Sequence, residues 1–257
     1  MLKLNNIYTS FAKGTVDEMK LFEDFNLTVN KGDFISIVGS NGSGKTTLLN
    51  LICGTLTPDS GSIVLKDKDI TALPEYKRSR YIGRVFQDPK AGTCSELTVL
   101  ENFALADNKN KCYALGRAIN KKRIDYYKSL LAECNMGLED RINTPIGSLS
   151  GGQRQAIALV LAGMTKVDLL ILDEHTAALD PKAAETIMEL THRLVSEKGL
   201  TAVMVTHNLR FATDYGNRII MMHGGRAILD KAGAEKDALQ VTDLLGIFNE
   251  ISIECGN

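Results

Sequence analysis

A glycine-rich segment of eight residues has the composition of a loop that holds phosphate. Residues 39–46 fit the pattern G-x-x-x-x-G-K-[ST] and lie between an expected strand, residues 34–38, and an expected helix that begins near Gly44. Glycines let successive backbone N–H groups point inward, and the helix N-terminus adds its positive dipole end. Lys45 would reach the β and γ phosphates of a bound polyphosphate, and the Thr46 hydroxyl would take one position on Mg²⁺. We expect these residues to line the site: Gly39, Ser40, Asn41, Gly42, Ser43, Gly44, Lys45, Thr46 and Thr47.

Two carboxylates follow an apolar run in the second half of the chain. Asp173 and Glu174 come directly after a predicted strand, residues 169–172, which places both acids at the carboxyl edge of a sheet, where open α/β folds bind ligands. Asp173 would bind Mg²⁺ directly or through water. Glu174 would orient or deprotonate an attacking water as the general base. An acidic pair can also merely open a surface loop, but a phosphate loop upstream favours the catalytic interpretation.

A third motif lies between these two. Residues 149–153 read Leu-Ser-Gly-Gly-Gln, in which Ser150 is a good helix N-cap, and Gly151 and Gly152 leave backbone N–H groups bare; we expect the helix itself from Gln155 onward. This arrangement predicts a second helix end that can bind an anion. The five letters resemble the LSGGQ signature of the ATP-binding cassette (ABC) ATPases, and the three motifs stand in the order that this family uses.

The resemblance covers essentially the whole chain and implies roles for further residues. It implies that Gln87 ends a core strand, joins the helical subdomain, contacts Mg²⁺ or water and senses a membrane partner. It also implies that His207 touches the γ-phosphate. Asp180 then belongs to the loop that crosses a dimer interface. Phe11 stands where the family places an aromatic ring against adenine, and Tyr8 is the competing candidate.

The resemblance also implies a partner for the ATPase chain. In the family, two subunits face head to tail, and ATP is held between the phosphate loop of one and the signature helix of the other. This chain holds one copy of each motif, so it needs a partner, most simply a second copy of itself. The signature residues expected to contact the nucleotide are Ser150, Gly151, Gly152 and Gln153.

The chain departs from the family pattern at a few positions. His175 stands where proline usually follows the acid pair, and we interpret it as a loop variant rather than a catalytic residue. Ala156 and Leu161 occupy positions that commonly carry arginine. None of these departures removes a predicted catalytic group.

Two functions of different classes fit these motifs. The leading one is the motor subunit of an ABC importer, which drives a separate integral membrane permease and is served indirectly by an extracytoplasmic substrate-binding protein. Residues 14–18, 73–78 and 173–181 resemble a subgroup that works with lipoprotein substrate-binding proteins, some of them assigned to aromatic amino acids such as tryptophan or tyrosine. The alternative is a soluble ABC-type ATPase without a permease, for iron–sulfur assembly or a DNA-related task.

The elements that must position these residues change in character along the chain. The N-terminal third predicts a mostly antiparallel β layer, residues 89–165 show helical spacing, and strands alternate with helices afterwards, which favours a parallel sheet. The expected fold is α/β. The resemblance implies a RecA-like P-loop NTPase core (1–88 and 166–257) with an antiparallel β subdomain, and a helical signature subdomain at 89–165. The expected strands are 2–7, 27–29, 34–38, 62–65, 169–172, 201–206, 218–222 and 226–230, and the expected helices are 99–106, 123–134, 155–164, 182–197, 209–214 and 241–250.

Composition narrows the setting. The 257 residues carry 30 basic and 31 acidic side chains, a near-neutral balance that gives no reason to expect nucleic acid as a partner. The longest apolar run, residues 156–164, falls far short of the roughly 20 residues that span a bilayer. Met1 opens no secretory leader, and the five cysteines, with no C-x-x-C pair, suit free thiols in a reducing compartment. We therefore expect a cytoplasmic protein, peripheral on the inner face of the membrane.

Overall fold

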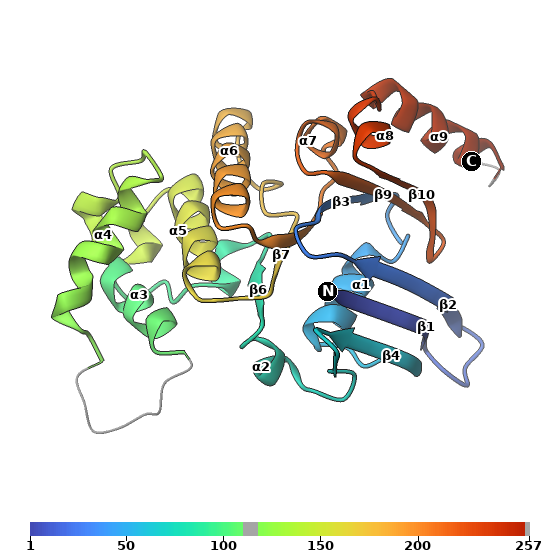
Figure 1. Cartoon of the computed structure of the whole chain (residues 1–257), viewed down its shortest axis with the longest axis horizontal. Helices are drawn as coiled ribbons and strands as arrows, with labels where there is room; N and C mark the ends of the chain where they lie inside the picture. Colours follow the sequence, from blue (N-terminus) through green and yellow to red (C-terminus); the bar gives the residue numbers. More distant parts are fainter. Residues whose placement is uncertain (110–117, 255–257) are drawn as a thin grey trace. The chain divides into compact units, whose positions relative to one another are not determined.

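The structure, a computed structural model, describes residues 1–109 and 118–254, and for 251–254 it describes the backbone alone. Within this part the chain forms two compact units, each built around β-strands with helices beside them (Figure 1). The first unit is discontinuous in sequence, whereas the second is one continuous segment. The units are Met1–Ser79 with Gly199–Asn257, and Arg80–Lys198.

An antiparallel sheet forms one half of the first unit. Its strands lie in the order β2-β1-β4-β5, with β1 at Leu2–Phe11, β2 at Met19–Val29, β4 at Ser60–Leu65 and β5 at Lys68–Asp69. Buried and exposed residues alternate along much of β1, as expected for a sheet with one face on the core. The expected antiparallel β layer is confirmed.

A second sheet of the first unit carries the phosphate loop. Strand β3, Phe34–Gly39, lies between β8, Thr201–Val205, and β9, Arg218–His223, and is parallel to both. Every residue of β3 and β8 is buried, as is typical of parallel strands covered on both faces. Strand β10, Arg226–Ala232, pairs antiparallel with β9.

Helix α1, Lys45–Cys53, follows β3 and has an arginine at its far end. Arg78, at the end of the short helix α2 (Glu75–Arg78), is 1% exposed and donates from Nη1 to the carbonyl oxygens of Leu51 at 2.6 Å and Ile52 at 3.0 Å. These carbonyls belong to the last turn of α1, which has no further helical partners for them. A buried cation therefore satisfies the C-terminus of the helix whose N-terminus opens the phosphate loop.

After β8, the described part of the first unit holds three further helices. They are α7 at Leu209–Asp214, α8 at Ala234–Asp237 and α9 at Val241–Glu254. Helices α7 and α9 pack against β3 and β9, and α8 lies against β10. An apolar cluster joins α7 and α9 to the two strands, and its buried members are Val38, Ala212, Ile219, Met221 and Leu244.

In the described residues of the second unit, two parallel strands combine with four helices. Strand β6, Ile82–Val85, pairs in parallel with β7, Leu169–Asp173. Short 3-10 turns connect several of the helices. The helices are α3 at Val99–Asp107, α4 at Ile124–Ala132, α5 at Gly151–Met164 and α6 at Pro181–Glu197, and the 3-10 turns are at Pro89–Ala91, Lys121–Arg123, Glu139–Arg141 and Ile146–Ser148.

The expected α/β fold is confirmed, and the elements predicted between residues 169 and 232 are correct to within two residues at each end. Three expectations at other positions were wrong. Strand β2 begins at Met19, far before the predicted residue 27, because Asp24 adopts φ +57° and shifts the register, which hides the alternation. Strand β1 ends at Phe11, four residues after its predicted end. Helix α5 begins at Gly151 instead of Gln155. The core strand that the resemblance implies before Gln87 is present as β6, although Gly83 and Arg84 interrupt its apolar pattern.

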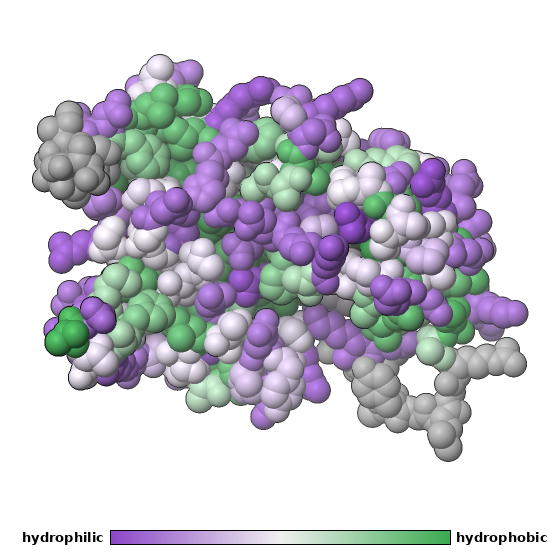
Figure 2. All heavy atoms as spheres, turned by 180° about the vertical axis from the view of Figure 1, so that it is seen from behind, coloured by the Kyte–Doolittle hydropathy of each residue, from purple (hydrophilic) through white to green (hydrophobic). Residues whose placement is uncertain are grey.

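Cys53, Cys94 and Cys134 are thiols rather than disulfide partners, whereas Cys112 and Cys255 lie outside the described residues. No helix in the described part of the chain is both long enough and apolar enough to cross a bilayer. In the view of Figure 2, hydrophilic residues cover much of the face, with apolar patches between them. Exposed apolar surface is ordinary for a folded protein, since apolar atoms contribute more than half of the accessible surface of a typical one.

Candidate nucleotide site

The phosphate loop between β3 and α1 has a backbone that requires glycine at two positions. Gly39 has φ +154°, and a Cβ there would lie 2.2 Å from the carbonyl oxygen of Met222. Gly44, the N-cap of α1, has φ +102°, and its Cβ would come within 3.0 Å of the Phe22 ring. Any side chain at either position would therefore push the loop away from its support.

Lys45 places its ammonium group inside this loop. The side chain is 5% exposed, and Nζ donates to the carbonyl oxygens of Gly39 at 2.8 Å and Ser40 at 2.9 Å. Because Gly44 has no side chain to cap α1, the first N–H groups of the helix are available to an anion. The predicted residues 39–47 thus form one cradle with a positive centre, and Thr46 lies exposed in the first turn of α1.

The turn between β9 and β10 supports the loop from the side, which the sequence did not indicate. Gly225 N donates to the Ser43 carbonyl oxygen at 3.1 Å, and Ser40 Oγ lies 3.5 Å from His223 Nδ1. A Cβ on Gly225 would lie 1.6 Å from the Leu21 carbonyl oxygen, so only glycine permits this approach. The predicted hairpin therefore also supports the phosphate loop through a backbone hydrogen bond.

The other predicted residues of the first unit lie at strand ends. His207 follows β8 and is exposed, whereas Thr206 directly before it is buried. Phe11, at the end of β1, is 36% exposed and lies opposite Met19, while Tyr8 is 41% exposed. Both rings present a free surface, so the choice of the adenine partner between Phe11 and Tyr8 stays a prediction.

The carboxylates of the second unit lie where the sequence predicts, after β7. Arg84 Nη2 donates to Asp173 Oδ2 at 2.7 Å, and the two side chains are 12% and 15% exposed. Glu174 follows with φ +47°, a left-handed conformation that is uncommon for a residue with a side chain. The chain therefore leaves the direction of β7 at Glu174, the predicted general base.

His175 is a buried anchor, which the interpretation as a loop variant did not anticipate. Its side chain is 2% exposed, and Nε2 lies 3.0 Å from Thr191 Oγ1 on α6. Thr191 Oγ1 donates its only proton to the Ile187 carbonyl oxygen at 2.7 Å, so the ring nitrogen must be the donor to Thr191. Burial lowers the pKa of His175 to about 4, which keeps the ring neutral.

Gln87 is exposed just after β6, and a residue overlooked in the sequence fixes the segment before it. Gln155 on α5 is 1% exposed, and its Nε2 donates to the Phe86 carbonyl oxygen at 3.1 Å. The sequence signal for this contact is a glutamine within a helix of mostly small and apolar residues, since a buried amide there needs a hydrogen-bond partner. The backbone next to Gln87 is thereby tied to the helix that the signature motif opens.

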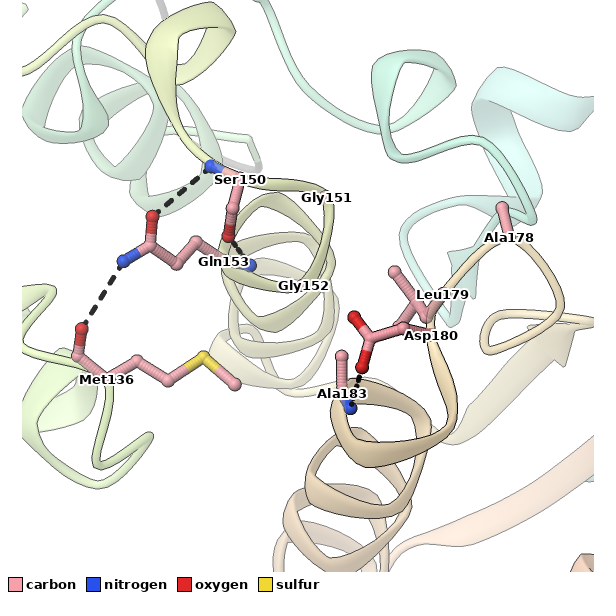
Figure 3. A pocket seen from close by; sticks show the side chains of 9 residues that line it. All are labelled: Met136, Ser150, Gly151, Gly152, Gln153, Ala178, Leu179, Asp180 and Ala183. Atoms are coloured by element: carbon pink, nitrogen blue, oxygen red, sulfur yellow. Dashed lines mark hydrogen bonds between the residues drawn. The ribbon is translucent and has the colours of Figure 1, made fainter.

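The signature residues and the Asp180 loop line a common cavity of about 510 Å³ (Figure 3). Ser150 is the N-cap of α5, and its Oγ accepts from Gln153 N at 3.3 Å while Gln153 Oε1 accepts from Ser150 N at 3.2 Å. Asp180 caps α6 in turn by accepting from Ala183 N at 3.0 Å. The lining residues are Met136, Ser150, Gly151, Gly152, Gln153, Ala178, Leu179, Asp180 and Ala183.

Small residues allow the two segments that line this cavity to lie close together. A Cβ on Gly152 would lie 3.3 Å from Ala183 Cβ, and one on Gly151 would lie 3.6 Å from Leu179 Cδ2. The structure therefore brings together two segments, Ser150 to Gln153 and the loop before Asp180, that were both predicted to face a second subunit.

The donor atoms predicted for a metal fit Mg²⁺. Asp173 offers a carboxylate and Thr46 a hydroxyl, and this ion prefers one or two such oxygens together with substrate phosphates and water. Among the described residues there is no group of three or more His, Cys, Asp or Glu side chains that could hold a metal ion.

Comparison with known proteins agrees with the three motifs. Residues 22–177 match the family described as ABC transporter. The chain belongs to the ABC transporter ATPase family. This ABC ATPase chain therefore binds ATP and hydrolyses it in a reaction coupled to transport.

Several relatives of this ABC ATPase chain belong to import systems. It is 43% identical to a tyrosine transport ATP-binding protein of Clostridioides difficile, over 96% of this chain and 98% of the relative. It is 31% identical to a phosphonates import ATP-binding protein of Alcaligenes faecalis, over 98% and 91%. It is thus the ATPase subunit of an importer-type system, which disfavours the alternative of an ABC ATPase without a permease.

Solved structures show the same fold. The dimeric post-hydrolysis state of the cassette MJ0796 bound to ADP and Pi has a TM-score of 0.76 at 31% identity, covering 90% of this chain and 98% of that one. The ADP conformation of the cassette MJ1267 has a TM-score of 0.79 at 28% identity, covering 100% and 99%. ABC ATPases of this kind dimerise and work with transmembrane components.

Proposed function

We propose that this chain is the ATP-hydrolysing subunit of an importer for an aromatic amino acid, with tyrosine as the first candidate. The observation that carries this proposal is the 43% identity to a tyrosine transport ATP-binding protein over nearly the full length of both chains. In this proposal the chain lies in the cytoplasm, on the inner face of a membrane, and drives a separate permease served by an extracytoplasmic substrate-binding protein.

Nucleotide binding is assigned to the first unit. The buried Lys45 ammonium, already surrounded by loop carbonyls, would turn toward the β and γ phosphates, which also receive the N–H groups of the α1 N-terminus. Phe11, or Tyr8 in its place, would stack on adenine. His207 would contact the γ-phosphate.

Hydrolysis is assigned to Glu174, which would orient and deprotonate the attacking water. Thr46, Asp173 and Gln87 are the residues that would hold Mg²⁺, and the bound ion would neutralise charge on the phosphates. The left-handed turn at Glu174 and the buried His175 that follows it hold the base on a short, fixed segment. Fixed placement matters because a general base must stay within hydrogen-bond reach of its water.

Dimer formation is assigned to the cavity of Figure 3. Ser150, Gly151, Gly152 and Gln153 would face the γ-phosphate held by a second copy of the chain, with Asp180 at the same interface. Two helix ends together surround the phosphate and exclude water from it, which a single one does not achieve. Gln87 would pass the resulting movement to the permease.

Purification from membranes in a mild detergent tests the proposal. We expect the chain to copurify with an integral membrane subunit, and the reconstituted complex to accumulate tyrosine in vesicles only when ATP and the binding protein are present. Tryptophan, phenylalanine and leucine serve as competing substrates. Recovery of the chain without a membrane subunit would contradict the importer, and preference for leucine would contradict the aromatic substrate.

A further inference from the structure

The predicted metal ligand Asp173 is held by a cation of its own unit. The guanidinium of Arg84 donates to its carboxylate at 2.7 Å, and less than a sixth of either side chain is exposed. A charge-assisted hydrogen bond in such a partly buried place is stronger than an ion pair on the surface. The Asp173 carboxylate is therefore already held by a specific partner, Arg84.

The register of the two strands builds this contact into the sheet. Arg84 on β6 lies opposite Ile171 on β7, and Asp173 follows two residues later, so Arg84 and Asp173 project from the same face. A diagonal neighbour of this kind is within reach of a long side chain. On its other side, the Arg84 guanidinium lies 4.8 Å from the centroid of the Phe86 ring, a cation–π contact.

A guanidinium and Mg²⁺ make opposing demands on one carboxylate. Arginine can only donate hydrogen bonds, whereas Mg²⁺ needs oxygen lone pairs at about 2.0–2.1 Å. The two cations also repel each other, and partial burial leaves little water to screen that repulsion. Arg84 is hydrogen-bonded to Oδ2 of Asp173, so binding of the ion at this carboxylate is opposed by the guanidinium and is favoured when the guanidinium moves away.

We propose that Arg84 occupies Asp173 until a divalent cation arrives with nucleotide, and that its release is part of metal binding. This inference rests on the proposed function, since that function assigns Asp173 to Mg²⁺. Without nucleotide, the guanidinium neutralises the carboxylate and suppresses metal binding. The added negative charge of the phosphates shifts the balance from the guanidinium toward the divalent ion.

Manganese binding measures this competition directly. Free Mn²⁺ is followed by its electron paramagnetic resonance signal, with and without ATP, in a Glu174→Gln background that prevents turnover. Arg84→Met removes the charge and keeps much of the length, and we expect it to raise Mn²⁺ affinity on the order of tenfold in both conditions. Arg84→Lys keeps the charge and should stay within about threefold of the parent. Adding Asp173→Asn to Arg84→Met should abolish the gain.

The chain offers a matched control in the same unit. Arg123 donates to Asp107 at 2.7 Å, as Arg84 does to Asp173, but no metal is assigned there. Arg123→Met should leave Mn²⁺ affinity unchanged. A gain in this control equal to that of Arg84→Met would overturn the proposal, because loss of any arginine would then suffice.

Two outcomes separate this inference from the proposed function. If ATP binds in EDTA but Arg84→Met leaves Mn²⁺ affinity within twofold or weakens it, the inference is wrong and the function stands. If ATP does not bind the parent chain at all, the proposed function itself fails.

Nuclear magnetic resonance of the Arg84 guanidinium in the unmutated ATP complex provides a test that does not depend on a folded variant. We expect Mg²⁺ to change the Arg84 side-chain resonance strongly, because the bond to Asp173 is lost. A resonance that Mg²⁺ leaves unchanged would overturn the proposal.

Discussion

Lys45 is the residue on which nucleotide binding would depend most in the proposed function. Its ammonium lies in a loop whose carbonyl oxygens, those of Gly39 and Ser40, already accept hydrogen bonds from it, so the cation is held in place before a nucleotide binds. A phosphate can then take over these interactions with a stronger charge-assisted bond.

Replacing Lys45 by alanine should weaken ATP binding at least tenfold, since a hydrogen bond to a charged group is worth about 1.5–3 kcal/mol. Equilibrium binding of a fluorescent ATP analogue in EDTA checks this without turnover. Lys31→Ala, at an exposed lysine of the same unit, is the control and should bind normally. Unchanged affinity of Lys45→Ala would count against the phosphate loop.

Glu174→Gln should lower steady-state hydrolysis by about 10²–10⁴-fold, the usual contribution of a general base, and leave ATP affinity near that of the parent. Phosphate release and nucleotide binding are measured on the same preparation. Glu189→Gln, at an exposed position of α6, should keep full activity. Hydrolysis near the parent rate in Glu174→Gln would show that another group is the base.

His175 couples the pH to the stability of the second unit. Its folded pKa of about 4 lies below the value of about 6.5 of an exposed histidine, so between these values the unfolded chain binds a proton that the folded chain does not. The free energy of unfolding is therefore highest above pH 6.5 and falls as the pH decreases toward 4, by on the order of 3 kcal/mol.

Urea unfolding between pH 7 and pH 4 measures this slope. His175→Gln should flatten this slope. His192→Gln, at an exposed histidine on α6 next to Thr191, should not. Equal slopes in the parent and in His175→Gln would show that other groups cause the pH dependence.

At the scale of elements, two helices of the second unit begin in the same way. Ser150 with Gln153 opens α5, and Thr98 with Glu101 opens α3, each as a reciprocal capping box. Loss of either cap should cost about 1 kcal/mol of stability. Only the first cap lies in the cavity assigned to the dimer interface.

This pair gives a matched test of the signature motif. Ser150→Ala and Thr98→Ala should lower the melting temperature by similar amounts, but only Ser150→Ala should prevent dimerisation with ATP in a Glu174→Gln background. Analytical ultracentrifugation with and without ATP distinguishes the two. Loss of the dimer in both variants would indicate a general effect of destabilisation.

Sequence reasoning succeeded where one physical signal dominates an element. The buried strand Phe34–Gly39 and the helix Pro181–Glu197 follow directly from apolar runs and periodicity. It failed where tertiary contacts decide. Gln155 donates to a backbone carbonyl 69 residues earlier in the chain. The buried His175 bonds to Thr191, which lies on the next helix. A local sequence pattern shows neither of these partners.

At the scale of the whole molecule, the head-to-tail dimer remains a prediction that mixing can test. Lys45→Ala has an altered phosphate loop and an intact signature, and Ser150→Ala has the reverse. A mixed dimer of the two would contain one composite site with both parts intact. We expect mixing to restore part of the ATP hydrolysis that each variant lacks alone. Activity no greater than the sum of the separate variants would contradict the head-to-tail arrangement.

The placement of β3 has a consequence for synthesis of the chain. The strands on both sides of it begin at Thr201 and Arg218, so its edges stay unpaired until most of the polypeptide has been made. At translation rates of about 5–20 residues per second, this delay is on the order of ten seconds or more. Throughout that time an apolar strand next to the phosphate loop is open to other nascent chains, and the ribosome-bound intermediate is the form most in need of a chaperone.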